Sequence, residues 1–286
     1  MKKCNCIAWK GFMEKIVKKI KNIPKRIYRK YESGQYRKGK YSKSLKIMDA
    51  KQTLEYLNNN CVSFCRFGDG EIAIMNGESI AFQQYHSELA KRLKKILIAD
   101  EVGLLVGINY FYLNPISNVN QYTQNFLNAM ANQRKFMIKN CNRNMTYMDA
   151  AITQMYQNYE NFDFEHYFQR FQKLFEKKDV TVVCGKNVLN SIQYNALSVC
   201  NSVEYIYAPN KDAFSQYDEI FEKVMQTNEK RIVCAILGPT AKVLVYDLFK
   251  VGRTAWDIGH YLKDYDAYMR KMPKTDDMIE KFFKPD

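Results

Sequence analysis

The last third of the chain alternates between short apolar runs and amphipathic stretches. Runs rich in β-branched and aromatic residues occupy 179–185, 202–209, 231–238 and 254–259, and each has the length of a strand. Helical spacing of apolar residues follows the first three runs, at 188–199, 217–226 and 241–252. Strands that are apolar on both faces and alternate with helices predict a Rossmann-like α/β fold, with a mostly parallel sheet and helices on both faces.

The first half of the chain continues this pattern less regularly. Helices are predicted at 45–60 and 86–100, and strands at 61–67 and 102–108. From about 120 to 178 the chain shows helical patterns rich in Phe, Tyr, Met and Gln, which we interpret as core and as the wall of an acceptor cleft. We therefore divide the chain into an N-terminal arm with its linker at 1–44 and a body at 45–286.

The N-terminal arm has the pattern of a basic amphipathic helix. Its apolar residues recur at helical spacing, with lysine and arginine on the opposite side, and they are Phe12, Ile16, Ile20, Ile23, Ile27 and Tyr31. Such a helix fits an anionic membrane surface, so residues 1–31 are a candidate peripheral membrane anchor. The alternatives are a solvated helix packed on the body and a loose tail. Pro24 is expected to kink or end the helix.

Charge is distributed unevenly between the two parts. The formal net charge is +14, and the excess of lysine and arginine lies in the first 46 residues, whereas the remainder of the chain is balanced. A nucleic-acid-binding protein usually carries its basic patch on the folded body. We therefore expect no nucleic-acid partner, and a non-catalytic nucleic-acid-binding protein that acts through the arm stays as an alternative.

Other patterns narrow the class of protein further. No apolar run reaches the ~18 residues that span a bilayer, and the N-terminus lacks the continuous apolar segment of a signal peptide. The eight cysteines do not have the spacing of a zinc site. A reduced, cytoplasmic protein is the simplest interpretation, with the arm at the inner face of the membrane. The glycine fingerprint of dinucleotide-binding dehydrogenases is also missing.

Two carboxylates follow the first predicted strand, in the stretch Arg-Phe-Gly-Asp-Gly-Glu. Asp69 and Glu71 flank Gly70, and in an extended or turning backbone such neighbours point the same way. Because two adjacent anions are stabilised by a hard cation, these residues are candidate ligands for Mn²⁺ or Mg²⁺. Gly68 and Gly70 would let the backbone approach a donor, and Arg66 would bind a phosphate. The alternative is an Asp-Gly turn in which Glu71 caps a helix.

Two strand-to-helix turns are candidate donor-binding sites. Gly238, Pro239 and Thr240 precede a helix whose free backbone N–H groups favour an anion. Gly185 and Lys186 form a similar turn, in which the lysine is available to a phosphate. The alternative for each turn is an ordinary connection between a strand and a helix.

The end of the last predicted strand carries a group of titratable residues, namely Asp257, His260, Asp264 and Asp266. Asp264 and Asp266 are candidates for a general base that deprotonates a sugar hydroxyl. His260 is a further candidate, because histidine transfers protons and binds phosphate or metal. The alternative is a solvated acidic loop with a structural histidine.

Three blocks of sequence, at 66–97, 205–220 and 237–260, together resemble the GT-D glycosyltransferases, formerly called domain of unknown function 1792. The resemblance covers about 45–270. It implies metal-dependent transfer of a sugar, typically glucose or a related hexose, from a UDP-sugar donor to a glycan or to a lipid-linked or protein-linked saccharide. The family's Asp-x-Glu motif falls on Asp69 and Glu71, which by this resemblance hold the metal and the donor diphosphate.

The chain departs from the family pattern at two places. The family's Asp-Ile-Gly-His segment falls on 257–260, but its following Glu-Tyr-Glu is replaced by Asp264-Tyr265-Asp266, which has shorter side chains. After the strand at 179–185 the family tends to have Gly-Glu-Gly, where this chain has Gly185-Lys186-Asn187. A nucleotide-dependent phosphotransferase or hydrolase with the same metal pair is the alternative enzyme class.

Overall fold

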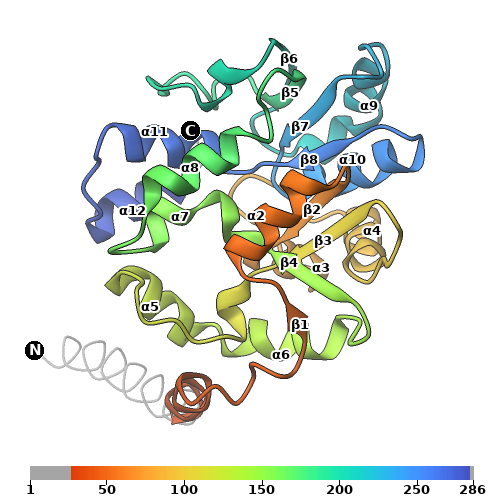
Figure 1. The fold of residues 1–286 in the computed structure, drawn as a ribbon. Helices are drawn as coiled ribbons and strands as arrows, with labels where there is room; N and C mark the ends of the chain where they lie inside the picture. The colour runs from red at the N-terminus through yellow and green to blue at the C-terminus, as the bar shows by residue number, and fades with distance from the viewer. Residues whose placement is uncertain (1–26, 284–286) are drawn as a thin grey trace, which may run out of the picture.

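A single parallel sheet organises the computed structural model, which describes residues 27–283 (Figure 1). Its eight strands are β1 Lys46–Ile47, β2 Ser63–Phe67, β3 Leu104–Ile108, β4 Thr146–Asp149, β5 Asp179–Gly185, β6 Ser202–Ala208, β7 Ile232–Ile236 and β8 Ala255–Asp257. They lie in the order β1-β4-β3-β2-β8-β7-β5-β6, and every neighbouring pair is parallel. This arrangement confirms the predicted Rossmann-like α/β class.

The helices lie on both faces of the sheet. They are α2 Ala50–Asn59, α3 Asp69–Met75, α4 Ser87–Leu97, α5 Gln121–Ala129, α6 Ala131–Asn140, α7 Met155–Asn158, α8 Phe164–Gln172, α9 Tyr217–Met225, α10 Pro239–Lys250, α11 Tyr261–Met269 and α12 Asp276–Phe283. Helix α10 contacts β2, β7 and β8 on one face together with α4, whereas α2 contacts β4. Right-handed crossovers require this division, because the chain moves along the sheet in opposite directions through α2 and α10.

The sheet reverses its direction of growth between β7 and β5. The connection from β7 leads to β8 on one side, and the connection from β5 leads to β6 on the other. Strands β2 and β3 are paired along their whole length, but β2 and β8 are paired only at Phe64 and Trp256. The Trp256 indole Nε1 adds a hydrogen bond to the Val62 carbonyl at 2.7 Å. Ligands of open α/β sheets bind at such a reversal, beside the carboxyl ends of the strands.

Most predicted elements are present, and their buried faces follow the predicted spacing. In α4 the apolar residues Leu89, Leu93, Ile96 and Leu97 are buried. Helix α2 begins with a capping box, in which the Asp49 carboxylate accepts from Gln52 N at 2.8 Å. These elements could be predicted because one apolar face or one capping residue determines them locally.

The structure differs from the prediction in several segments. The helix predicted at 45–60 begins only at Ala50, and Lys46–Ile47 form strand β1 instead. Residues 188–199 are mostly turns and end in a short 3₁₀ helix, Ala196–Val199, although a full helix was expected. The Asn195 carboxamide caps this 3₁₀ helix by accepting from Leu197 N at 2.9 Å, so helix begins only there. Strand β4 was not predicted within the central helical region, because four residues are too short to show an alternating pattern.

Part of the basic arm is described and packs on the body. Residues 27–37 are helical, and the Tyr36 ring lies 4.3 Å from the Arg134 guanidinium carbon. Ile27 and Tyr31 are exposed on this helix. The other predicted apolar positions of the arm, together with Pro24, lie outside the described residues. Among residues 27–283, none of the helices has the length and apolar character needed to cross a membrane.

Candidate active site

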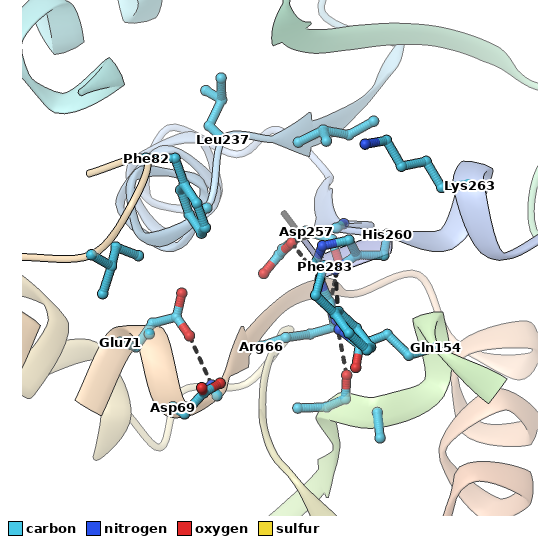
Figure 2. Close-up of a pocket in the computed structure, with 18 of the residues that line it drawn as sticks. Arg66, Asp69, Glu71, Phe82, Gln154, Leu237, Asp257, His260, Lys263 and Phe283 are labelled. Carbon is cyan, nitrogen blue, oxygen red and sulfur yellow. Dashed lines mark hydrogen bonds and ion pairs between the residues drawn. The ribbon is translucent and has the colours of Figure 1, made fainter. Parts of the chain in front are cut away.

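A cavity of about 500 Å³ opens at the carboxyl edge of the sheet, where the sheet reverses direction (Figure 2). Its floor comes from the ends of β2 and β8, and its walls come from the segments after β3, β4, β5, β6 and β7. The volume is in the range of sites that hold a nucleotide-sized ligand. The predicted site residues that line it are Arg66, Gly68, Asp69, Gly70, Glu71, Gly185, Gly238, Asp257 and His260.

Asp69 and Glu71 lie in the first turn of α3 and have different surroundings. Asp69 is exposed, whereas Glu71 is buried, and its Oε2 accepts from Gly68 N at 2.8 Å in a capping box. The chain turns directly into a helix, so the two side chains do not point the same way as an extended backbone would direct them. Burial and the nearby Glu71 carboxylate raise the pKa of Asp69. The open carboxylate of the motif is therefore Asp69.

Lys242 lies buried beneath Glu71 and was not predicted as a site residue. Its ammonium Nζ is 2.7 Å from Glu71 Oε1, 2.9 Å from Asp257 Oδ2 and 3.1 Å from the Gly238 carbonyl. Burial alone lowers the pKa of Lys242, but Asp257 and Glu71 outweigh burial and raise it. The ammonium therefore stays charged and compensates two carboxylates that would otherwise be buried without a partner.

Arg66 joins three segments under the cavity. Its Nε and Nη2 donate to the carbonyl and Oδ1 of Asp257 at 2.8 and 2.9 Å, and its Nη1 donates to the Ala150 carbonyl at 2.9 Å and to Thr153 Oγ1. All three guanidinium nitrogens thus bind protein groups, although we had expected this residue to hold a phosphate. Burial raises the pKa of Asp257, but Arg66 and Lys242 outweigh it and hold that pKa below its ordinary value.

Gly259 is required where the Arg66 guanidinium passes. A Cβ at this position would lie 1.8 Å from Arg66 Nη2, and the glycine has a φ of +40°. Gly238 has a similar constraint, because a Cβ there would lie 2.4 Å from the Phe82 ring and its φ is +53°. Both glycines therefore allow close packing at the floor and wall of the cavity.

His260 lies on the cavity wall beside two aromatic rings of α12. Phe282 and Phe283 are 5.5 and 5.4 Å from its ring, and its Nδ1 is 3.0 Å from Gln154 Nε2. Burial and the positive charge of Arg66 lower the pKa of His260 to about 3. The imidazole is therefore neutral at physiological pH, which makes it a hydrogen-bonding group rather than a charged one.

Asp264 and Asp266 are not brought into the cavity. The two Asp264 oxygens accept from the backbone N–H groups of Tyr156 and Gln157 at 2.9 and 3.1 Å, so this carboxylate caps the start of α7. Asp266 Oδ1 accepts from Gln193 N and Tyr194 N, both at 2.9 Å, and thereby anchors the 186–195 loop. This corrects the expectation that either residue meets an acceptor hydroxyl, because both are buried and bonded to backbone.

The two predicted donor-binding turns are only partly at the cavity. Gly185 and Gly238 line it, whereas the side chain of Lys186 is exposed outside the lining. Pro239 is the first residue of α10 and is buried. The Thr240 hydroxyl is buried too and donates to Gln83 Oε1 at 3.0 Å. Lys186, Pro239 and Thr240 therefore have no contact with the cavity in this structure.

The candidate metal-binding groups of the cavity fit a divalent cation only if a bound substrate supplies further oxygen ligands. Among residues 27–283 no group of three or more His, Cys, Asp and Glu side chains is placed to hold a metal ion. Asp69 offers an open carboxylate, while both Glu71 oxygens already have partners. Mg²⁺ is commonly bound through one or two carboxylates plus waters and substrate phosphates, so this site fits a cation that arrives with a diphosphate.

Sequence reasoning missed Lys242, Gln154 and Phe283 as cavity residues. A signal for Lys242 was present, because it is the only charged residue among 239–245, the mostly apolar first two turns of α10. A lysine in such a position needs a buried acidic partner. No comparable signal exists for Gln154 and Phe283, since only the tertiary fold brings α7 and α12 to the cavity.

Comparison with known proteins agrees with this architecture. The family model described as glycosyltransferase GT-D fold matches residues 64–284. The chain belongs to the GT-D glycosyltransferase family. Among solved structures, "The highly conserved domain of unknown function 1792 has a distinct glycosyltransferase fold" matches with a TM-score of 0.77 and 30% identity over 84% of this chain and 86% of that one. "A New Glycosyltransferase (DUF1792) from Streptococcus sanguinis" matches with a TM-score of 0.75 and 28% identity, over 79% and 85% of the two chains.

Two curated relatives of this GT-D chain are longer proteins. "Probable glycosyl transferase Gly" of Streptococcus gordonii is 28% identical over 79% of this chain and 33% of its own length. "Glycosyltransferase GlyD" of Streptococcus pneumoniae serotype 4 is 26% identical over 82% of this chain and 29% of its own length. The chain thus spans about a third of these relatives.

Proposed function

We propose that this GT-D glycosyltransferase moves glucose or a related hexose from a UDP-sugar donor to a saccharide acceptor. The observation that carries the proposal is the placement of an open carboxylate, Asp69, on the cavity at the reversal of a parallel sheet. Nucleotides bind α/β sheets at this point. Family membership supplies the reaction class, and the donor and acceptor are our assignment.

The side of the cavity formed after β5, β6 and β7 suits the nucleotide. Gly185 lines this side, and it has no room for a side chain because a Cβ there would lie 2.4 Å from Asn210 Oδ1, so the turn packs closely on Asn210. Gly238 lines this side immediately before α10, a helix of twelve residues. Leu237 adds an apolar surface beside these turns.

Asp69 would hold Mn²⁺ or Mg²⁺ together with the donor diphosphate. When bound, such a cation offsets the negative charge that develops on the leaving nucleoside diphosphate. The protein's own contribution is rigidity, since Glu71 fixes the first turn of α3 through Gly68 N and through the Lys242 ammonium. His260, which is neutral, would orient the acceptor hydroxyl rather than carry a charge.

The acceptor is proposed to be a glycan or a lipid-linked or protein-linked saccharide. The exposed Ile27 and Tyr31 lie on the described end of the basic arm, and they support a peripheral membrane role for residues 1–31. Such an arm would concentrate the enzyme near a lipid-linked acceptor at the inner face of the membrane. Only the described end of the helix supports this part of the proposal.

A nucleotide-sugar screen tests the proposed function. The full chain is incubated with UDP-glucose, UDP-galactose, UDP-N-acetylglucosamine and GDP-mannose, with Mn²⁺ or with a chelator, and thermal stabilisation and release of nucleoside diphosphate are measured. We expect a response to a UDP-hexose that is lost with the chelator. Equal responses to all four donors, or responses that the chelator leaves intact, would contradict the proposal.

A further inference from the structure

The cavity has two sides of different chemistry, separated by Arg66 and Asp257. Figure 2 shows Phe82 and Leu237 on one side of this pair, and Gln154 and Phe283 on the other. The second side is built by segments after β3 and β4, with contributions from α5 and α12. Its lining is rich in amide and aromatic side chains and contains no carboxylate among the described residues.

Three amides on this second side each use one end to bind the protein. Asn109 Oδ1 accepts from Phe111 N at 3.0 Å, and Asn158 Oδ1 accepts from the Thr123 hydroxyl at 3.1 Å. Gln154 Nε2 is 3.0 Å from His260 Nδ1. These contacts fix the orientation of the three carboxamides before any ligand binds.

The opposite end of each amide has no hydrogen-bond partner among residues 27–283. These ends are Asn109 Nδ2, Asn158 Nδ2 and Gln154 Oε1. Because all three atoms lack a partner within this range and yet are not fully buried, each retains some accessible surface. The cavity side therefore presents two oriented donors and one oriented acceptor. A sugar hydroxyl both donates and accepts, so this set matches a polyhydroxylated, uncharged ligand.

Aromatic rings complete this side of the cavity. Tyr122 and Phe126 of α5 line it, and Phe283 of α12 lines it next to His260. Ring faces pack against the C–H surface of a sugar, while fixed amides select its hydroxyl groups, which is the division of roles seen in ligand pockets generally. The Arg66 nitrogens are all bound to protein groups and His260 is neutral, so these two groups offer no charge to an acidic ligand. Lys263 also lines the cavity and acts on the pKa of His260, and it already interacts within the chain.

We propose that the side of the cavity lined by Asn109, Gln154 and Asn158 is the acceptor subsite, and that it binds a neutral saccharide residue. The inference rests on the proposed function, because it assigns the opposite side to the nucleotide. It adds the residues that recognise the acceptor and the chemical class of sugar they accept.

Isosteric substitutions test the assignment without emptying the cavity. Asn109→Asp and Asn158→Asp keep the oxygen that accepts from the protein and replace the inward-facing amide nitrogen by an oxygen. Asn210→Asp makes the same chemical change on the opposite side, where Asn210 Oδ1 accepts from Asn187 N at 3.4 Å. Binding of methyl β-glucoside and methyl β-N-acetylglucosaminide is measured by ligand-observed NMR, and binding of UDP by calorimetry with Mn²⁺.

We expect Asn109→Asp and Asn158→Asp to lower the affinity for the glycosides by about tenfold, the effect of one lost hydrogen bond. The affinity for UDP should change by less than about twofold. Asn210→Asp should lower the affinity for UDP and leave the affinity for the glycosides unchanged. Methyl glucuronide should bind more weakly than the neutral glycosides.

Three outcomes would overturn the assignment. They are loss of UDP binding in the first two variants with glycoside binding intact, equal binding of glucuronide, and absence of glycoside binding in an unaltered chain that binds UDP. Failure of UDP to bind at all would instead contradict the proposed function, and the glycoside measurements would still be scored separately.

Discussion

The ammonium of Lys242 lies 2.7 Å from Glu71 Oε1, and this contact joins α10 to the first turn of α3 under the cavity. The same ammonium is 2.9 Å from Asp257 Oδ2, so one cation links the first turn of α3 to the end of β8. The acidic motif therefore contains one carboxylate that is part of the framework and one, Asp69, that is open.

Removing the buried cation should be costly. Lys242→Met leaves Glu71 and Asp257 as buried charges with one partner fewer, and we expect a loss of ~3–5 kcal/mol in the free energy of unfolding. Lys250→Met serves as the matched control on the same helix, because its exposed ion pair with Glu101 contributes at most ~1 kcal/mol. Urea denaturation of both variants measures the loss in the free energy of unfolding. Similar losses in the two variants would contradict a framework role for Lys242.

The two carboxylates of the motif should separate activity from stability. Asp69→Asn should reduce sugar transfer roughly 100-fold or more, because it would weaken the hold on the cation that offsets the charge of the leaving diphosphate. It should leave stability unchanged or slightly higher, because burial and Glu71 raise the pKa of Asp69 and make its charge unfavourable. Initial rates with UDP-hexose and thermal melts are measured in parallel, with the exposed Glu78→Gln as control.

Glu71→Gln should behave differently from the Asp69 variant. It keeps one oxygen but replaces the other by an amide N–H, so either the Gly68 N–H or the Lys242 ammonium loses its acceptor. We expect a loss of ~1–3 kcal/mol in stability in addition to reduced transfer. A Glu71→Gln protein as stable as the unaltered chain would show that the cap and the ion pair do not hold this turn.

Gly259 offers a test of the packing around Arg66. Gly259→Ala would place a methyl group 1.8 Å from Arg66 Nη2, whereas Gly252→Ala also has a positive φ but meets no atom within 4 Å. Backbone strain is thus common to both variants, and only the first displaces the guanidinium. We expect Gly259→Ala to lose roughly 2 kcal/mol or more beyond the loss in Gly252→Ala. Equal losses by chemical denaturation would mean that Arg66 adjusts freely.

Asp264 should give the fold a particular pH dependence. Burial raises its pKa to about 7, whereas an unfolded aspartate titrates near 4, so the native state binds this proton more tightly. The contribution of Asp264 to the free energy of unfolding is therefore greatest below about pH 4. It falls by about 1.4 kcal/mol per pH unit until about pH 7. Denaturation of the unaltered chain and of Asp264→Asn at pH 5, 6 and 7 measures it. The stability of the unaltered chain should fall relative to that of Asp264→Asn as the pH rises from 5 to 7, and a constant difference would contradict the raised pKa.

The basic arm gives a prediction about membranes. Deleting residues 1–26 leaves the described helix at 27–37 on the body, with Tyr36 still packed against Arg134. We expect the deletion to lower sedimentation with vesicles that contain phosphatidylglycerol and to leave the weak sedimentation with phosphatidylcholine vesicles unchanged. Unchanged binding to the anionic vesicles would reject a membrane role for the arm.

The sequence allowed the fold class to be predicted because its determinants are local. Two-sided apolar strands and the buried stripe of α4 show their period within a dozen residues, so most of β2, β3 and β5–β8 could be located. Strands β1 and β4 are too short for such a pattern. They pair with each other at one edge of the sheet, and β4 also pairs with β3, so tertiary pairing defines them.

The candidate site was predicted less completely, for a different reason. The position of Asp69 at a strand end could be inferred from its neighbours, but the partners of Arg66, Asp264 and Asp266 are backbone groups distant in sequence. A carboxylate bonded to two N–H groups looks the same in sequence as one that faces a ligand. Residue type alone therefore could not separate the structural acids from the open one.

The weak pairing of β2 with β8 at Phe64 and Trp256 has a consequence for how such enzymes diversify. Each flank of the sheet forms its own hydrogen-bond ladder. Ion pairs of Asp257 in β8 with Arg66 in β2 and with Lys242 connect the two flanks. On the proposed assignment, insertions or exchanges in the segments after β3 and β4 would change the acceptor side of the cavity without disturbing the flank assigned to the donor. A chimera that joins one relative's β1–β4 flank to another's β5–β8 flank should fold as long as these ion pairs are retained.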